Sequence, residues 1–127
     1  MSTILIVDDD FEWRMLIHRL LQKSGYEVLE AENGKNALKV LENSAIDLVL
    51  TDILMPIMDG VELIRELAQR HPGLPVIAMT SNIEMPYLNI AMKLGAMNCL
   101  QKPFNRNQLL EMINEALGKI NDSIIHE

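Results

Sequence analysis

The sequence predicts an α/β protein in which helices cover both faces of a parallel sheet. Five short apolar runs alternate with five helical patterns along the chain, an order typical of βαβ units. Several of these runs are continuously apolar, as expected of strands buried on both faces. The predicted strands are Ile4–Val7, Tyr26–Ala31, Asp47–Thr51, Val76–Thr80 and Asn98–Gln101.

The first two predicted helices have clear start signals. Asp10 is placed to cap the first helix, and Gly25 to stop it. The apolar stripe of that helix comprises Trp13, Leu16, Ile17, Leu20 and Leu21. His18 lies off this stripe, so we expect it to be solvated. Asn33 is the predicted cap of the second helix.

The remaining helices follow the same logic. Asp59 precedes Gly60 in a turn and is placed to cap the third helix. A fourth helix is predicted from about Met85 to Leu94. Asn105 and Gln108 have the spacing of a capping box at the start of the last helix.

Composition narrows the classes of function. At 127 residues we expect one domain, residues 1–127, with a core over about 3–118 and a tail from 119 to 127. A net charge of −7 argues against direct nucleic-acid binding, which needs a basic face. Cys99 is the only cysteine, which fits a reducing compartment. With neither a signal peptide nor a membrane-length apolar run, we expect a cytoplasmic protein.

Polar side chains end four of the predicted strands. Asp8 and Asp9 follow the first strand, Asp52 follows the third, Thr80 ends the fourth and Lys102 follows the fifth. Ligands of open α/β sheets bind at the carboxyl ends of the strands. Three acids converging on one lysine are costly unless a cation or a phosphoryl group completes the cluster. The sequence therefore predicts a phosphorylation switch.

Several stretches together resemble the receiver domain of bacterial two-component response regulators. The resemblance covers residues 3 to 118, and four motifs in this order make it specific. They are Ile4–Asp10, Asp47–Gly60, Pro75–Ser81 and Gly95-Ala96 with Lys102-Pro103-Phe104. The resemblance implies a doubly wound (βα)5 fold, with a five-stranded parallel sheet in the order 2-1-3-4-5, which is the flavodoxin-like receiver fold.

The resemblance also implies a magnesium site. Asp9, Asp52 and the backbone carbonyl of Leu54 would hold Mg²⁺, and Asp8 would act through a coordinated water. Carboxylate, carbonyl and water oxygens are the ligands that this hard cation prefers.

The resemblance implies that Asp52 is the phosphoacceptor. A sensor histidine kinase, a phosphotransfer protein or a small acyl phosphate would supply the phosphoryl group. Thr80 and Lys102 would contact its oxygens, and Lys102-Pro103 would be a cis peptide. The domain would catalyse its own phosphorylation and slow dephosphorylation, without being an enzyme for a separate substrate. A downstream effector protein or a fused output domain would respond.

The chain departs from the family pattern near this site. Receivers usually carry Tyr or Phe three residues before the lysine, where this chain has Cys99. Leu54 and Asn82 occupy the two variable positions that line access to the phosphoryl group.

Two other functions are open at this point. A receiver-fold interaction module that works without phosphorylation is mildly favoured by Cys99, but the intact site residues argue against it. These are Asp9, Asp52, Thr80 and Lys102. A metal-dependent phosphohydrolase similar to haloacid dehalogenases would need small turn residues after its first strand, where this chain has Phe11–Trp13.

Overall fold

The structure is a computed structural model that describes residues 2–81 and 85–118. The strands are β1 (Thr3–Val7), β2 (Glu27–Ala31), β3 (Leu48–Asp52), β4 (Val76–Thr80) and β5 (Asn98–Gln101). The helices are α1 (Phe11–Lys23), α2 (Gly34–Asn43), α3 (Gly60–Arg70), α4 (Met85–Leu94) and α5 (Arg106–Ala116). All strand pairs are parallel, and the sheet order is β2-β1-β3-β4-β5. The predicted fold class is confirmed.

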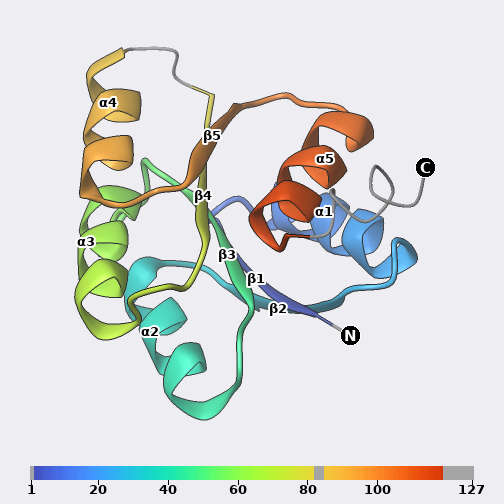
Figure 1. Cartoon of the computed structure of the whole chain (residues 1–127), viewed down its shortest axis with the longest axis horizontal. Helices are drawn as coiled ribbons and strands as arrows, with labels where there is room; N and C mark the ends of the chain where they lie inside the picture. Colours follow the sequence, from blue (N-terminus) through green and yellow to red (C-terminus); the bar gives the residue numbers. More distant parts are fainter. Residues whose placement is uncertain (1, 82–84, 119–127) are drawn as a thin grey trace.

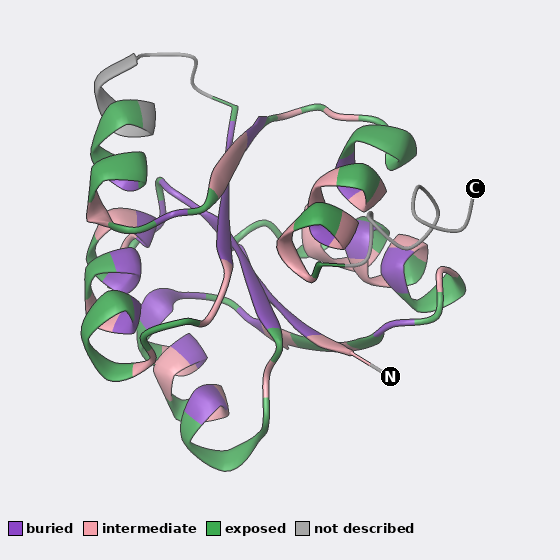
Figure 2. Cartoon of the chain, viewed as in Figure 1, coloured by how far each residue is buried: buried purple, intermediate pink, exposed green. Residues whose placement is uncertain are grey.

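The helices form two layers, one on each face of the sheet. Helices α1 and α5 cover one face, and α2, α3 and α4 cover the other (Figure 1). Each layer encloses its own apolar core (Figure 2). No helix in the described ranges is both long and apolar enough to cross a membrane.

Strand β1 shows why the central runs are continuously apolar. Leu5 and Val7 pack into the core on the α2–α4 side, while Ile4 and Ile6 pack into the core beneath α1 and α5. Successive side chains of a strand point to opposite faces. Because both faces are covered, every position of β1 from Ile4 onward is buried.

Side-chain caps begin four of the helices. The carboxylates of Asp10 and Asp59 and the amide oxygens of Asn33 and Asn105 each accept a backbone N–H three residues on, over 2.8–3.2 Å. At α5, Gln108 also accepts the backbone N–H of Asn105 at 3.0 Å. These contacts satisfy N–H groups that a helix leaves unpaired at its start. The predicted caps and the capping box are confirmed.

Two expectations for α1 are wrong. Leu16 is 57% exposed, because the side chains that face the sheet core from this helix are Ile17 and Leu21. His18 is only partly solvated: its side chain is 28% exposed, and its Nδ1 lies 2.5 Å from a carboxylate oxygen of Glu30 on β2. The predicted tail, residues 119–127, lies outside the described residues.

Candidate functional site

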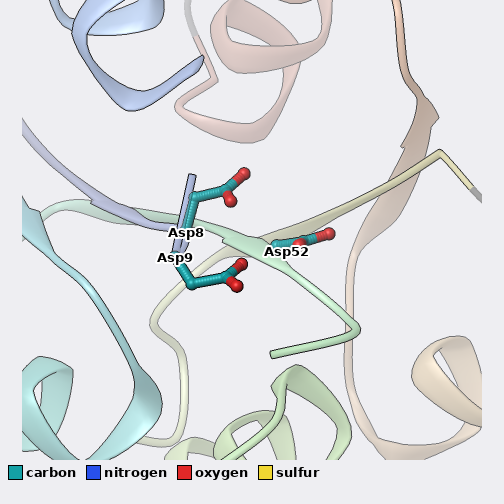
Figure 3. Close-up of side chains that lie close together, drawn as sticks. All are labelled: Asp8, Asp9 and Asp52. Carbon is teal, nitrogen blue, oxygen red and sulfur yellow. The ribbon is translucent and has the colours of Figure 1, made fainter. Parts of the chain in front are cut away.

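The candidate site lies where the carboxyl ends of β1 and β3 meet. In the parallel register Val7 pairs with Thr51, so the residues that follow them arrive at the same edge of the sheet. Carboxylate oxygens of Asp8, Asp9 and Asp52 lie within 4.8 Å of one another. Figure 3 shows the three side chains pointing to the same side. The structure thus brings together the three acids singled out in the sequence.

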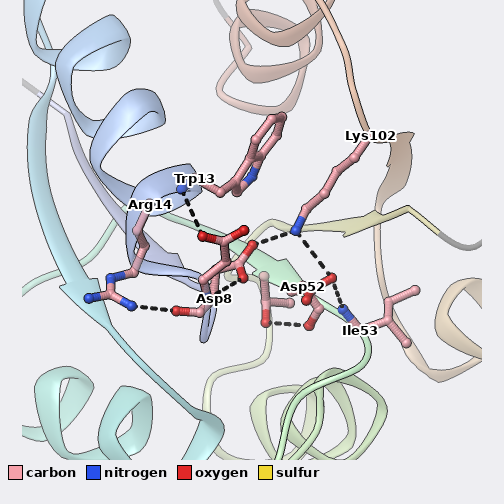
Figure 4. Close-up of polar contacts among 8 residues, drawn as sticks. Asp8, Trp13, Arg14, Asp52, Ile53 and Lys102 are labelled. Atoms are coloured by element: carbon pink, nitrogen blue, oxygen red, sulfur yellow. Dashed lines mark hydrogen bonds and ion pairs between the residues drawn. The ribbon is translucent and has the colours of Figure 1, made fainter.

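Lys102, which follows β5, completes this cluster. Its Nζ donates to Oδ2 of Asp8 at 2.6 Å and lies 3.6 Å from Oδ1 of Asp52 (Figure 4). Asp8 is fully buried, Asp52 is 8% exposed, and the Lys102 side chain is 13% exposed. In such surroundings charges interact more strongly than in water. One ammonium faces three carboxylates, so the cluster carries an excess of negative charge.

Burial and the excess of negative charge change the pKa of Asp52. Its pKa is raised from 3.8 to about 6, chiefly by burial and further by repulsion from Asp8 and Asp9. The Lys102 ammonium and a hydrogen bond from the Ile53 backbone N–H oppose the shift without cancelling it. A carboxyl group whose charged form is disfavoured by its surroundings is typical of functional sites, where a cation or a reactant supplies the missing opposite charge.

An aromatic ring also contacts Lys102. The Nζ atom lies 5.1 Å from the centroid of the Trp13 ring, within the range of a cation–π contact. Phe104 meets the same ring edge-on, with centroids 5.1 Å apart. The ammonium thus contacts the Trp13 ring, and Phe104 packs against that ring.

The loop between β3 and α3 packs closely against the backbone of Asp52. A Cβ at Gly60 would lie 2.1 Å from the Asp52 carbonyl oxygen, so only glycine fits this close approach. The Gly60 N–H donates to the carbonyl of Ile53 at 2.7 Å. At the rim, Leu54 is 43% and Ile57 is 76% exposed. Ile57 has φ +70°, a left-handed conformation that costs a non-glycine residue about 1–2 kcal/mol.

The donor set fits a hard divalent cation. Three carboxylates within 4.8 Å, one of them exposed at Asp9, offer the oxygen ligands that Mg²⁺ prefers. A divalent cation bound here would neutralise the excess negative charge on these buried oxygens. The backbone carbonyl of Leu54 stays a prediction as a fourth ligand.

The other sequence-predicted residues lie around this cluster. Thr80 ends β4 and is buried, and its carbonyl accepts the backbone N–H of Lys102 at 2.8 Å. The Lys102-Pro103 peptide is cis, as expected. Cys99 is half-buried against the core on the α4 side, and burial raises the pKa of its thiol. Asn82 lies outside the described residues.

Two polar residues near the site are not singled out by the sequence pattern. Arg14 on α1 donates to the backbone carbonyl of Asp8 at 2.7 Å, and Glu30 on β2 accepts from Arg14. A polar residue within a helix is ordinarily part of a solvated face. The one available signal is that Glu30 lies in a strand that ends at the same edge of the sheet as β1.

Known proteins share both this sequence pattern and this fold. Residues 4–114 match the family model of the response regulator receiver domain. The DNA-binding transcriptional regulator NtrC of Escherichia coli K12 is 36% identical over 115 residues, which are 91% of this chain and 24% of NtrC. The transcriptional regulatory protein CpxR homolog of Haemophilus influenzae is 38% identical over 94% of this chain and 52% of its own length.

Solved structures agree with the sequence relatives. A CheY-like receiver domain protein from Methanospirillum hungatei superposes with a TM-score of 0.89 at 32% identity, covering 97% of this chain and 98% of that one. The chain belongs to the response regulator receiver domain family, whose members act in phosphorylation-activated signalling. It spans about a quarter of the length of NtrC and about half that of the CpxR homolog.

Proposed function

We propose that this receiver domain accepts a phosphoryl group on Asp52. The observation that carries the proposal is the meeting of three carboxylates and one ammonium at the carboxyl ends of the strands, with Lys102 3.6 Å from Asp52. Phosphoryl transfer depends on positioning and charge neutralisation more than on covalent chemistry by the protein. This cluster supports both.

Each residue has a separate part in the transfer. A carboxylate oxygen of Asp52 attacks phosphorus, the bond from phosphorus to the donor breaks, and the leaving group departs with the electron pair of that bond. The Lys102 side chain is 13% exposed. Its ammonium moves toward the new phosphoryl oxygens and offsets their charge. The Thr80 hydroxyl donates to another of these oxygens.

A divalent cation, Mg²⁺, would be held by Asp9, Asp52 and the Leu54 carbonyl, with Asp8 acting through a coordinated water. When bound, the cation neutralises charge on the phosphoryl group during transfer. Asp8 keeps Lys102 beside the site through the 2.6 Å contact until the phosphoryl group takes its place.

The donor and the responding partner follow from membership of the family. A sensor histidine kinase or a phosphotransfer protein would supply phosphohistidine, and a small acyl phosphate would serve in its place. An effector protein or a fused output domain would read the phosphorylated state. We place this activity in the cytoplasm, in keeping with the single cysteine.

Incubation with acetyl phosphate and Mg²⁺ tests the proposal. The intact mass of the wild type should increase by one phosphoryl group, and that of Asp52→Asn should not change. Asp47→Asn, at the other end of the same strand, is the matched control and should react as the wild type does. An unchanged wild-type mass, or an equal gain in Asp52→Asn, would contradict the assignment.

A further inference from the structure

Arg14 joins helix α1 to the loop that carries Asp8 and Asp9. Its Nη1 donates to the backbone carbonyl of Asp8 at 2.7 Å (Figure 4). Its guanidinium carbon lies 5.6 Å from the centroid of the Phe11 ring. The Arg14 side chain is 13% exposed and Asp8 is fully buried, so the hydrogen bond to the Asp8 carbonyl is shielded from water, whereas Phe11 is 60% exposed. Arg14 therefore contacts Asp8 in the loop and Phe11 at the start of α1, one on either side of Asp9 in the sequence.

Asp9 depends on that loop for its direction. Asp8 and Asp10 are held by hydrogen bonds: the Asp10 N–H donates to Oδ1 of Asp8 at 3.0 Å, and the Asp10 carboxylate accepts the Trp13 N–H. In the described part of the chain, the exposed Asp9 carboxylate has no such bond of its own. Its position relative to Asp52 is therefore set by the backbone between Asp8 and Phe11.

Glu30 and His18 hold Arg14 in turn. The Nε of Arg14 donates to one carboxylate oxygen of Glu30 at 2.8 Å, and Nδ1 of His18 lies 2.5 Å from the other. Burial favours a higher pKa for Glu30, but its hydrogen bonds to Arg14 and His18 outweigh burial and lower the pKa. Glu30 therefore stays charged near neutral pH. An arginine held at two points by charge-assisted hydrogen bonds has little freedom to turn.

We propose that Arg14 is a positioning residue for the cation site: through the Asp8 carbonyl it aligns the carboxylates of Asp8 and Asp9 toward Asp52. This inference rests on the proposed function, because it assigns Arg14 to the same magnesium-dependent site. Groups that orient metal ligands without touching the metal commonly change affinity when they are removed.

The sign of the effect separates positioning from simple electrostatics. Arg14 is a cation near an acidic site, so its charge alone opposes Mg²⁺ binding. If charge were its whole role, removing it would tighten binding. If Arg14 aligns the ligands, its removal weakens binding. A purely structural role would lower the melting temperature and leave the Mg²⁺ affinity unchanged.

Titration with Mg²⁺ alone, followed by the fluorescence of Trp13, tests the proposal in the full chain. Arg14→Gln should raise the Kd about tenfold, at the lower end for groups that orient metal ligands. Glu30→Gln should raise it less, about threefold, because Glu30 acts only through Arg14. Arg14→Lys keeps the charge but loses the two-pronged contact, and should also weaken binding. It keeps the test informative if Arg14→Gln does not fold. Arg70→Gln removes a second arginine–glutamate pair found among the described residues, Arg70 with Glu66 at 3.0 Å on α3, and should leave the Kd unchanged.

A second measurement completes the test. With acetyl phosphate at saturating Mg²⁺, Arg14→Gln should recover most of the wild-type phosphorylation rate, because the defect lies in binding of the cation. Suppose that the wild type binds Mg²⁺ and takes up phosphate, but Arg14→Gln and Arg14→Lys bind Mg²⁺ as tightly as the wild type or more tightly. That result would overturn the role of Arg14 and leave the proposed function intact. A wild type that binds no Mg²⁺ would overturn both.

Discussion

The two ends of strand β3 carry the same kind of residue in opposite surroundings. Asp47 precedes the strand, is exposed and accepts the backbone N–H of Thr3 at 2.7 Å. Asp52 ends the strand, is 8% exposed and faces Asp8 and Lys102. The Asp47 carboxylate is exposed and accepts a hydrogen bond from the start of β1, while the Asp52 carboxylate is buried beside another negative charge. Burial and neighbouring charges therefore indicate function here, whereas residue type alone does not.

The largest effect on stability should come from breaking the buried ion pair at the carboxyl end of the sheet. Lys102→Met leaves the Asp8 carboxylate fully buried without its 2.6 Å partner. Breaking a buried pair by removing one charge costs about 3–5 kcal/mol. We expect a loss of that size in the free energy of unfolding, measured with urea in the absence of divalent cations.

The exposed pair between Arg70 and Glu66 provides the control. Its side chains are 53% and 31% exposed, so Arg70→Gln should cost at most about 1 kcal/mol. Similar losses in both variants would show that the carboxyl end of the sheet is no more sensitive to charge removal than the protein surface.

The pH dependence of stability should reveal Asp52 itself. Because its pKa is raised from 3.8 to about 6, the folded protein binds this proton more tightly than the unfolded chain does. The stability due to the protonated carboxyl is complete below about pH 4 and is lost as the pH rises through about 6. At about 1.4 kcal/mol for each pKa unit, the loss is about 3 kcal/mol near neutral pH.

Asp52→Asn, which stays neutral, should therefore be more stable than the wild type by about that amount near neutral pH without metal. The difference should shrink toward zero near pH 4. Urea unfolding at the two pH values measures it. Asp47→Asn should change stability little at either pH, and an equal gain in that variant would remove the distinction between the two strand ends.

Much of this molecule could be predicted from its sequence, and the exceptions have physical causes. The strand β1 was recognisable because both of its faces are buried, which makes its apolar run continuous. Asp8 and Lys102 directly follow strands and Asp52 ends one, so the topology alone brings them together. The positions of Leu16, His18 and Arg14 depend instead on the rotation of α1 over the sheet and on the contact with Glu30, which neither periodicity nor motif encodes.

Mg²⁺ should relieve the repulsion at the carboxyl end of the sheet and so stabilise the fold. Binding to the folded state alone, at tenfold above Kd, adds about 1.4 kcal/mol, or about 5 °C in Tm for a domain of this size. Asp9→Ala should reduce this shift, and Asp47→Ala should not. A Tm that responds to Ca²⁺ or Zn²⁺ and not to Mg²⁺ would mean that the metal is misassigned.

The smallest expected effect concerns the apolar rim of the site. Leu54 is 43% exposed two residues after Asp52 and has no polar group to align water for attack on an acyl phosphate. The phosphorylated protein should therefore lose its phosphoryl group slowly, over many minutes or longer.

Leu54→Asn adds a hydrogen-bonding group of the kind that orients water. One hydrogen bond worth about 1 kcal/mol in the transition state corresponds to an increase of about fivefold in the rate. The decay of intact mass after acetyl phosphate is removed gives this rate. Leu54→Met, which keeps an apolar side chain of similar size, should decay as the wild type does. Equal or slower decay in Leu54→Asn would show that access to phosphorus is governed by something other than the polarity of this position. If both variants accelerate, the shape and flexibility of the side chain at Leu54 matter and its polarity does not, because methionine keeps the size and apolar character of leucine but is unbranched and more flexible.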